Sequence, residues 1–127
     1  MKIESFTDLT VWQRAHGLTL ALYKLTEKFP DRERFGIVAQ IRRSAASVSA
    51  NIAEGFGRRT TRELLRSLQI ARGELAETRY FSILGRDLGY VTREDFGRIA
   101  AECDAVGKLI NALATSLQRR LASRVVH

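Results

Sequence analysis

Apolar residues recur every three or four positions toward the end of the chain. The series is Phe96, Ile99, Cys103, Val106, Ile110, Leu113, Leu117 and Leu121. Because an α-helix turns once in 3.6 residues, this spacing places all of these side chains on one face. A face sustained over more than three heptads is typical of a helix in a bundle. The pattern therefore predicts a helix over about 93–121 that packs against other helices.

Two further helices are predicted in the first half of the chain, over about 8–29 and 33–55. Asp8 is a suitable N-cap for the first, and Pro30 ends it. The glycines within 54–57 are expected to provide the left-handed backbone that ends the second. The predicted buried faces are Leu9, Trp12, Ala15, Thr19, Leu22, Thr26 and Phe29 in the first helix and Ile37, Ile41, Val48 and Ile52 in the second.

A third helix is predicted over about 61–88. Thr60 and Glu63 have the spacing of a capping box, and Gly89 ends the helix. Four helices of similar length joined by short turns pack with alternating direction. We therefore predict that residues 1–127 form a single all-α domain, an antiparallel up-down-up-down four-helix bundle.

The outward side of the third helix carries two kinds of residue. At about 100° per residue, the inward side is formed by Leu64, Ala71, Leu75, Thr78 and Ser82. Arginines lie nearly opposite, namely Arg58, Arg59, Arg62 and Arg66. Farther along this outward side are Tyr80, Leu84 and Leu88. Outward apolar residues predict a subunit interface, which we favour, or a surface covered by the N-terminal arm 3–6.

The net charge of the chain is +7, from 21 Lys and Arg against 14 Asp and Glu. Such a chain attracts polyanions before any specific contact forms, although charge also serves simply to keep proteins dispersed. There is no run of about 18 apolar residues that would span a membrane. The N-terminus lacks the apolar segment of a secretory signal, so we expect a cytoplasmic protein.

Residues suited to catalysis or metal binding are sparse. The two histidines are His127, the last residue, and His16, which lies at the edge of an apolar face where a structural role is favoured. Cys103 has apolar neighbours at helical spacing and is expected to be a core residue. Glu74 and Glu77 lie three residues apart but have no accompanying histidine, unlike the ligands of di-metal bundles. We expect no catalytic residue, no metal and no cofactor.

Polar residues also follow the apolar face of the second helix, at Gln40, Arg43, Ser44, Ser47, Asn51 and Glu54. The favoured interpretation is a hydrogen-bonded network that fixes the register of the helices, because buried polar groups need partners. The alternative is that some of them line a cavity or a channel shared within an oligomer. Gly73 is expected to mark a close approach to the second helix, since glycine inside a helix is otherwise unfavourable.

A family resemblance rests on the segment 40–55, QIRRSAASVSANIAEG, together with DLTVW at 8–12, ARGELAE at 71–77 and DLGY at 87–90. Over about 6–120, the chain resembles the bacterial four-helix-bundle proteins first noticed as reading frames in intervening sequences of 23S rRNA genes. Glu74 departs from the serine that is common at this position. The family is similar to the accessory variability protein of diversity-generating retroelements, a basic pentamer that associates with nucleic acid and a reverse transcriptase. The resemblance implies a pentamer, and a reverse transcriptase as partner if one is encoded nearby.

The function predicted from these features is non-enzymatic binding of nucleic acid by an oligomer, through phosphates and shape. Structured RNA or an RNA–DNA hybrid is the expected ligand, because no aromatic platform for single strands accompanies the arginines. The main phosphate contacts are assigned to Arg58, Arg59, Arg62 and Arg66, and second-rank contacts to Arg42, Arg43, Arg72 and Arg79. The alternative is a structural adaptor that docks a protein partner, with the arginines serving only as a solvated face.

Overall fold

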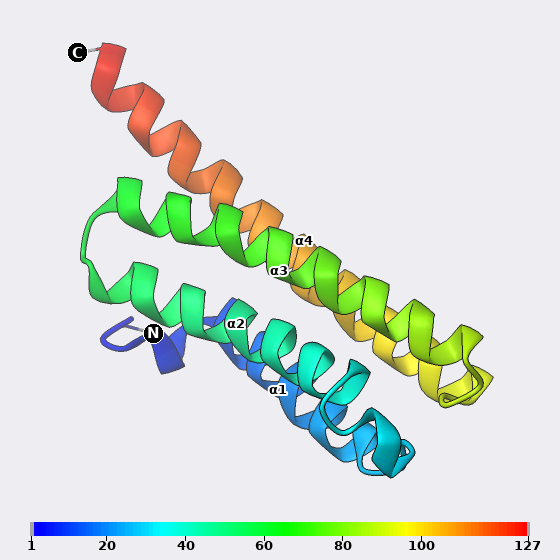
Figure 1. Cartoon of the computed structure of the whole chain (residues 1–127). Coiled ribbons are helices and arrows are strands. Elements are labelled where there is room, and N and C mark those ends of the chain that lie inside the picture. The colour runs from blue at the N-terminus through cyan, green and yellow to red at the C-terminus, as the bar shows by residue number, and fades with distance from the viewer. Residues whose placement is uncertain (1, 127) are drawn as a thin grey trace.

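The computed structural model describes residues 2–126, in which all regular structure is helical. The long helices are α1 (Thr10–Thr26), α2 (Ile37–Gly57), α3 (Thr61–Asp87) and α4 (Arg93–Val126). Consecutive helices run in opposite directions (Figure 1). Each helix packs against the next, and α1 also packs against α4, which closes the bundle. The predicted all-α class and four-helix architecture are confirmed.

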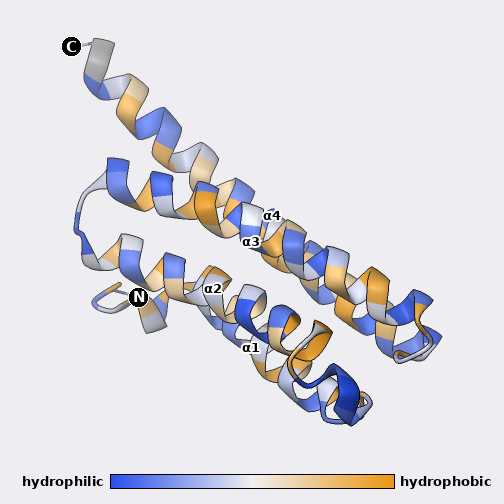
Figure 2. Cartoon of the chain, viewed as in Figure 1, coloured by the Kyte–Doolittle hydropathy of each residue, from blue (hydrophilic) through white to orange (hydrophobic). Residues whose placement is uncertain are grey.

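The larger of the two core clusters contains residues from every long helix. Leu22, Ile52, Leu68 and Ile110, one from each helix, are fully buried. Apolar and hydrophilic residues alternate along the ribbons, as expected for amphipathic helices (Figure 2). A smaller cluster of Phe29, Ile37, Val38 and Val91 fills the end of the bundle where α1 meets α2 and α3 meets α4. No helix of the described residues is long and apolar enough to cross a membrane.

The predicted core positions agree closely with the buried ones. In α4, Ile99, Cys103, Val106, Ile110 and Leu117 are buried, whereas Phe96, Leu113 and Leu121 are half-buried. All four apolar positions predicted for α2 are buried. In α1 the prediction omitted Val11 and Leu18, both buried, and included Leu9 and Trp12, which are half-buried.

The chain enters the bundle differently from the prediction. Asp8 does not cap α1, because it lies in a short 3-10 helix, Phe6–Asp8, that precedes it. The Ser5 side chain accepts from the backbone of this helix, and the Asp8 carboxylate accepts from the backbone N–H groups of Glu4 and Ser5 at 3.0 Å. This capping box fixes the N-terminal arm. At the other end of the chain, α4 continues beyond Leu121 to Val126.

A close approach of α2 to α3 occurs at a glycine other than the one predicted. A Cβ placed on Gly73 would have no atom within 4 Å, so the expected close approach there is wrong. A Cβ on Gly55 would instead lie 2.4 Å from Cβ of Ser67. Because no real side chain tolerates such a distance, Gly55 allows α2 and α3 to meet where the chain reverses between them.

Candidate nucleic-acid interface

The turn between α2 and α3 reverses the chain within three residues. Arg58 is the C-cap of α2, and Thr60 is the N-cap of α3, with its hydroxyl accepting from the backbone N–H of Glu63 at 3.1 Å. Between them, Arg59 has a left-handed backbone with φ 65°. The left-handed residue is therefore an arginine, and the expectation that glycines 55 and 57 supply this conformation is wrong. The tight reversal presents Arg58 and Arg59 together at the tip.

The four arginines predicted as the main phosphate contacts lie at this end of the bundle. All of them, Arg58, Arg59, Arg62 and Arg66, are exposed. Arg58 pairs with Glu54 at 3.2 Å, a surface ion pair that contributes little to stability. Within residues 2–126, no carboxylate or hydrogen-bond acceptor engages the side chains of the other three. Their charges are available to a ligand.

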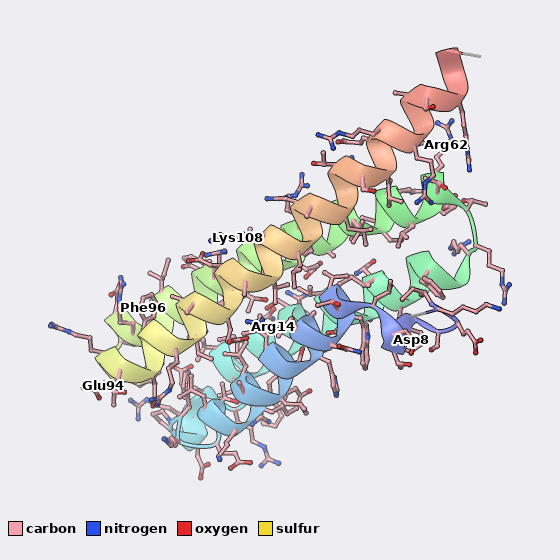
Figure 3. All side chains as sticks on the ribbon, turned by 180° about the vertical axis from the view of Figure 1, so that it is seen from behind. Asp8, Arg14, Arg62, Glu94, Phe96 and Lys108 are labelled. Atoms are coloured by element: carbon pink, nitrogen blue, oxygen red, sulfur yellow. The ribbon has the colours of Figure 1, made fainter. Side chains whose placement is uncertain are left out.

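The C-terminal part of α4 adds positive charge that the sequence-based interpretation missed. The helix α4 runs on past the point where α3 begins (Figure 1), and its C-terminal part carries the exposed Arg119, Arg120 and Arg124. Figure 3 shows Arg62 at the same end, beside this extension of α4. Arg120 lines one cleft with Arg59. The signal for this contribution was the basic sequence after Leu117. We use the name basic end for these arginines together, which are Arg58, Arg59, Arg62, Arg66, Arg119, Arg120 and Arg124.

Of the second-rank arginines, three are engaged within the chain. Arg42 donates from Nε to the Thr26 hydroxyl at 2.8 Å and from a terminal nitrogen to the carbonyl of Tyr23 at 3.1 Å. Arg79 pairs with Asp104 at 2.8 Å. These side chains join helices to one another. Arg43, the third, is part of a separate polar cluster on α2 and α3.

Arg43 occupies the centre of this polar cluster. It donates to Gln40 at 3.2 Å, lies 3.4 Å from a carboxylate oxygen of Glu74 and forms a second ion pair with Glu77. The glutamates that had no assigned role thus tie α3 to α2. By contrast, Arg72 is exposed and engages no partner in the part of the chain that the structure describes.

The polar residues predicted along the apolar face of α2 divide into two groups. Ser44 is fully buried, and the Thr78 hydroxyl of α3 donates to it at 2.9 Å, as expected for a network that fixes the register of two helices. The other members are half-buried or exposed, which corrects their placement on the buried face. The exposed members are Gln40, Arg43 and Glu54. The half-buried members are Ser47 and Asn51, and the Asn51 side chain donates to the Ser47 carbonyl at 2.8 Å.

The three residues assigned to a subunit interface are exposed to different extents. Tyr80 and Leu88 are 55% and 49% exposed, whereas Leu84 is half-buried against the smaller apolar cluster. The alternative that the N-terminal arm covers them is wrong. Ile3 instead lines clefts beside the α2–α3 turn and beside α1, at the opposite end of the bundle from Leu88. An apolar surface therefore remains on α3.

The histidine and the cysteine considered for catalysis lie in different surroundings, since His16 is exposed and Cys103 is buried. The ring of His16 stacks on that of Trp12, with centroids 4.8 Å apart. Cys103 is 1% exposed, and burial raises its thiol pKa to about 11, so it is protonated at neutral pH as a core residue. No group of three potential metal ligands occurs within the described residues. His127 lies outside them.

Comparisons with known proteins agree with the fold. A crystal structure of a protein of unknown function from the S23 ribosomal protein family of Bacteroides thetaiotaomicron has a TM-score of 0.76 and 25% sequence identity, covering 83% of this chain and 95% of that chain. No curated protein matches the sequence. The model of the 23S rRNA-intervening sequence proteins matches residues 7–112. Since the match covers α1, α2 and α3 and extends into α4, the chain belongs to the 23S rRNA-intervening sequence protein family.

Proposed function

We propose that this protein is a non-enzymatic, oligomeric nucleic-acid-binding protein that holds structured RNA or an RNA–DNA hybrid by its phosphates. The observation that carries the proposal is the basic end, where α2, α3 and α4 contribute exposed arginines. Guanidinium groups form strong, paired hydrogen bonds with phosphate oxygens. Arginines without internal partners give up no intramolecular ion pair when they bind.

The geometry favours recognition of shape over recognition of sequence. The arginines come from three segments at one end of the bundle, an arrangement that suits a folded backbone with phosphates in several directions. Phe56, the aromatic residue nearest the turn, is half-buried and offers no exposed platform for successive bases. The family description, which refers to intervening sequences of 23S rRNA, supports an RNA-related role.

Assembly into a pentamer forms part of the proposal. Its support is the exposed apolar surface of α3, including Tyr80 and Leu88, together with the resemblance to the pentameric retroelement accessory protein. An oligomer would present several copies of the basic end to one ligand and so raise its overall affinity. The same apolar surface also favours the second candidate, a structural adaptor that docks a protein partner and has no nucleic-acid role.

The decisive experiment compares two variants with the same net charge. Arg62→Glu with Arg66→Glu reverses two charges of the basic end, and Arg34→Glu with Arg93→Glu reverses two exposed charges at the opposite end. Each pair of reversals removes four charges from +7 and leaves +3. The purified proteins are titrated against duplex DNA, structured RNA and an RNA–DNA hybrid at two salt concentrations, with the mass in solution measured alongside.

Under the proposal, the wild-type protein binds with an affinity that falls steeply with salt, and the change at the basic end abolishes binding. The salt slope depends on the number of phosphates neutralised, so each lost contact lowers it by about one. The control variant retains most of the affinity. No binding at low salt by an assembled oligomer, or equal losses in both variants, would contradict the proposal; the first result would favour the adaptor.

A further inference from the structure

A cleft at the basic end combines charged and apolar walls. Its volume is about 370 Å³, within the range of small-molecule sites. Arg59 of the turn and Arg120 of α4 line it from separate segments, with Thr60 and Thr61 beside them. The apolar part of the lining is Ile3, Phe56, Leu64 and Leu117. Such a lining suits a ligand that has an anionic group at one side and a flat, weakly polar body at the other.

Both guanidinium groups are available to an anion. Arg59 and Arg120 are exposed, and within residues 2–126 the guanidinium group of neither residue is hydrogen-bonded or ion-paired. The cleft between α1 and α4 differs in this respect, although it is larger at about 570 Å³. Its lining holds two carboxylates, Asp95 and Glu102. Both Lys28 and Arg98 pair with Asp95, which leaves Lys24 as the cation of this lining without an ion pair to the described residues. Of these two clefts, the one at the basic end is therefore suited to a phosphate.

The backbone at Arg59 is a second observation that points to this cleft. Its φ of 65° lies in the left-handed region, which is unfavourable for residues other than glycine. Strained backbone of this kind is concentrated at functional sites. A glycine would adopt the same turn without strain, but it would remove the guanidinium from the cleft.

The remaining wall is the N-terminal arm, which is held in place by hydrogen bonds. Ile3 and Glu4 line the cleft, and the backbone N–H of Glu4 donates to the Asp8 carboxylate at 3.0 Å. The Glu4 carboxylate is the acidic member of the lining and opposes the two guanidinium groups in attracting an anion. Removing that carboxylate should therefore strengthen anion binding.

We propose that this cleft binds one unpaired nucleotide of the nucleic acid, with its phosphate between Arg59 and Arg120 and its base against Leu64 and Phe56. This inference rests on the proposed function and adds a site to it. A base stacked within a duplex cannot enter a cleft of this size, so the nucleotide is a strand end or an unpaired position. The basic end holds the duplex, and the cleft selects molecules that have such a nucleotide nearby.

The test follows the methyl NMR signals of Leu64 and Leu117 in the full-length protein during titration with adenosine monophosphate, adenosine or inorganic phosphate. The nucleotide should shift both signals saturably and bind at least tenfold more tightly than phosphate alone. Arg59→Gly, which relieves the left-handed strain, and Arg120→Gln should each weaken its binding at least tenfold. Glu4→Gln should strengthen it. Arg93→Gln, the control at an exposed arginine of the opposite end that is outside the cleft lining, should leave it unchanged.

The inference is overturned if the nucleotide shifts these signals no more than phosphate does, or if Arg59→Gly and Arg120→Gln bind it as well as the wild type. Blunt-ended duplex RNA separates this failure from failure of the proposed function. If the duplex binds in a salt-dependent way but adenosine monophosphate does not shift the two leucine signals, the nucleotide site is rejected and the proposed function is retained. If neither the duplex nor the nucleotide binds, both proposals are rejected.

Discussion

Gly55 and Ser67 face each other across the contact between α2 and α3, where a Cβ on the glycine would lie 2.4 Å from the serine Cβ. Gly55→Ala therefore forces the two helices apart beside the turn that carries Arg58 and Arg59. Overpacking of this kind costs about 1–3 kcal/mol. We expect the free energy of unfolding, measured in urea, to fall by about this amount.

Gly17→Ala is the matched control for this change. Gly17 lies in the interior of α1, and a Cβ there would have no atom within 4 Å. Alanine should stabilise the helix by about 0.5–1 kcal/mol, because it loses less backbone freedom on folding. A Gly55→Ala protein as stable as the wild type would show that α2 and α3 do not meet this closely.

Arg42 and Arg72 are both second-rank candidates for phosphate contact, but they differ in their surroundings. Arg42 donates to Thr26 and Tyr23 at the end of α1 and stacks 4.6 Å from the ring centre of Tyr23. Arg42→Ala should lower the free energy of unfolding by about 1 kcal/mol, since the site is partly exposed. Arg72→Ala should change it by less than about 0.5 kcal/mol.

The same two variants separate stability from binding when titrated with structured RNA. Arg42→Ala should bind as the wild type does at a temperature where it is fully folded. If it instead kept its stability and lost RNA affinity, Arg42 would be a ligand contact and its internal hydrogen bonds would be unimportant.

The fold was predictable because helix periodicity and burial are local properties of the sequence. The spacing in α4 identified Ile99, Val106 and Ile110 as core residues, and Gly89 was correctly placed at the end of α3, where its φ is 82°. Helix ends were less predictable. The short 3-10 helix before α1 is capped by Ser5 and Asp8 together. A capping box needs both side chains to accept from the backbone of the same turn, so Asp8 by itself was not sufficient to locate the helix end.

The candidate site was only partly predictable because it depends on which helix ends meet. Periodicity placed Arg62 and Arg66 on the outer side of α3, where both are exposed. It could not show that α4 extends past the α2–α3 turn and brings Arg120 beside Arg59. Nor could it separate Arg43, which pairs with two glutamates, from arginines without partners.

Substitution of Tyr80 and Leu88 tests the proposed assembly into a pentamer. Tyr80→Glu with Leu88→Glu places two charges on the exposed apolar surface of α3, and burying them between subunits would be unfavourable. The mass measured by light scattering should fall to that of a smaller species, while the helical circular dichroism spectrum is retained. Asn111→Glu is the control, because Asn111 is an exposed polar residue of α4 and lies outside the apolar surface of α3. An unchanged mass for the double variant would place the interface elsewhere.

Cys103 makes stability depend on pH in the alkaline range. Burial raises its pKa from 9.0 to about 11 in the folded protein. Between these values the unfolded chain loses the thiol proton while the folded protein keeps it, so stability falls as pH rises, by at most about 1.4 kcal/mol per unit. Below pH 9 the contribution of the buried thiol to stability is complete.

The variant Cys103→Ala lacks this titration but retains those of lysine and tyrosine. The difference in free energy of unfolding between wild type and variant should be constant from pH 7 to 8.5 and decrease between pH 9 and 11. A constant difference across the whole range would mean that the thiol is accessible to water in the folded protein.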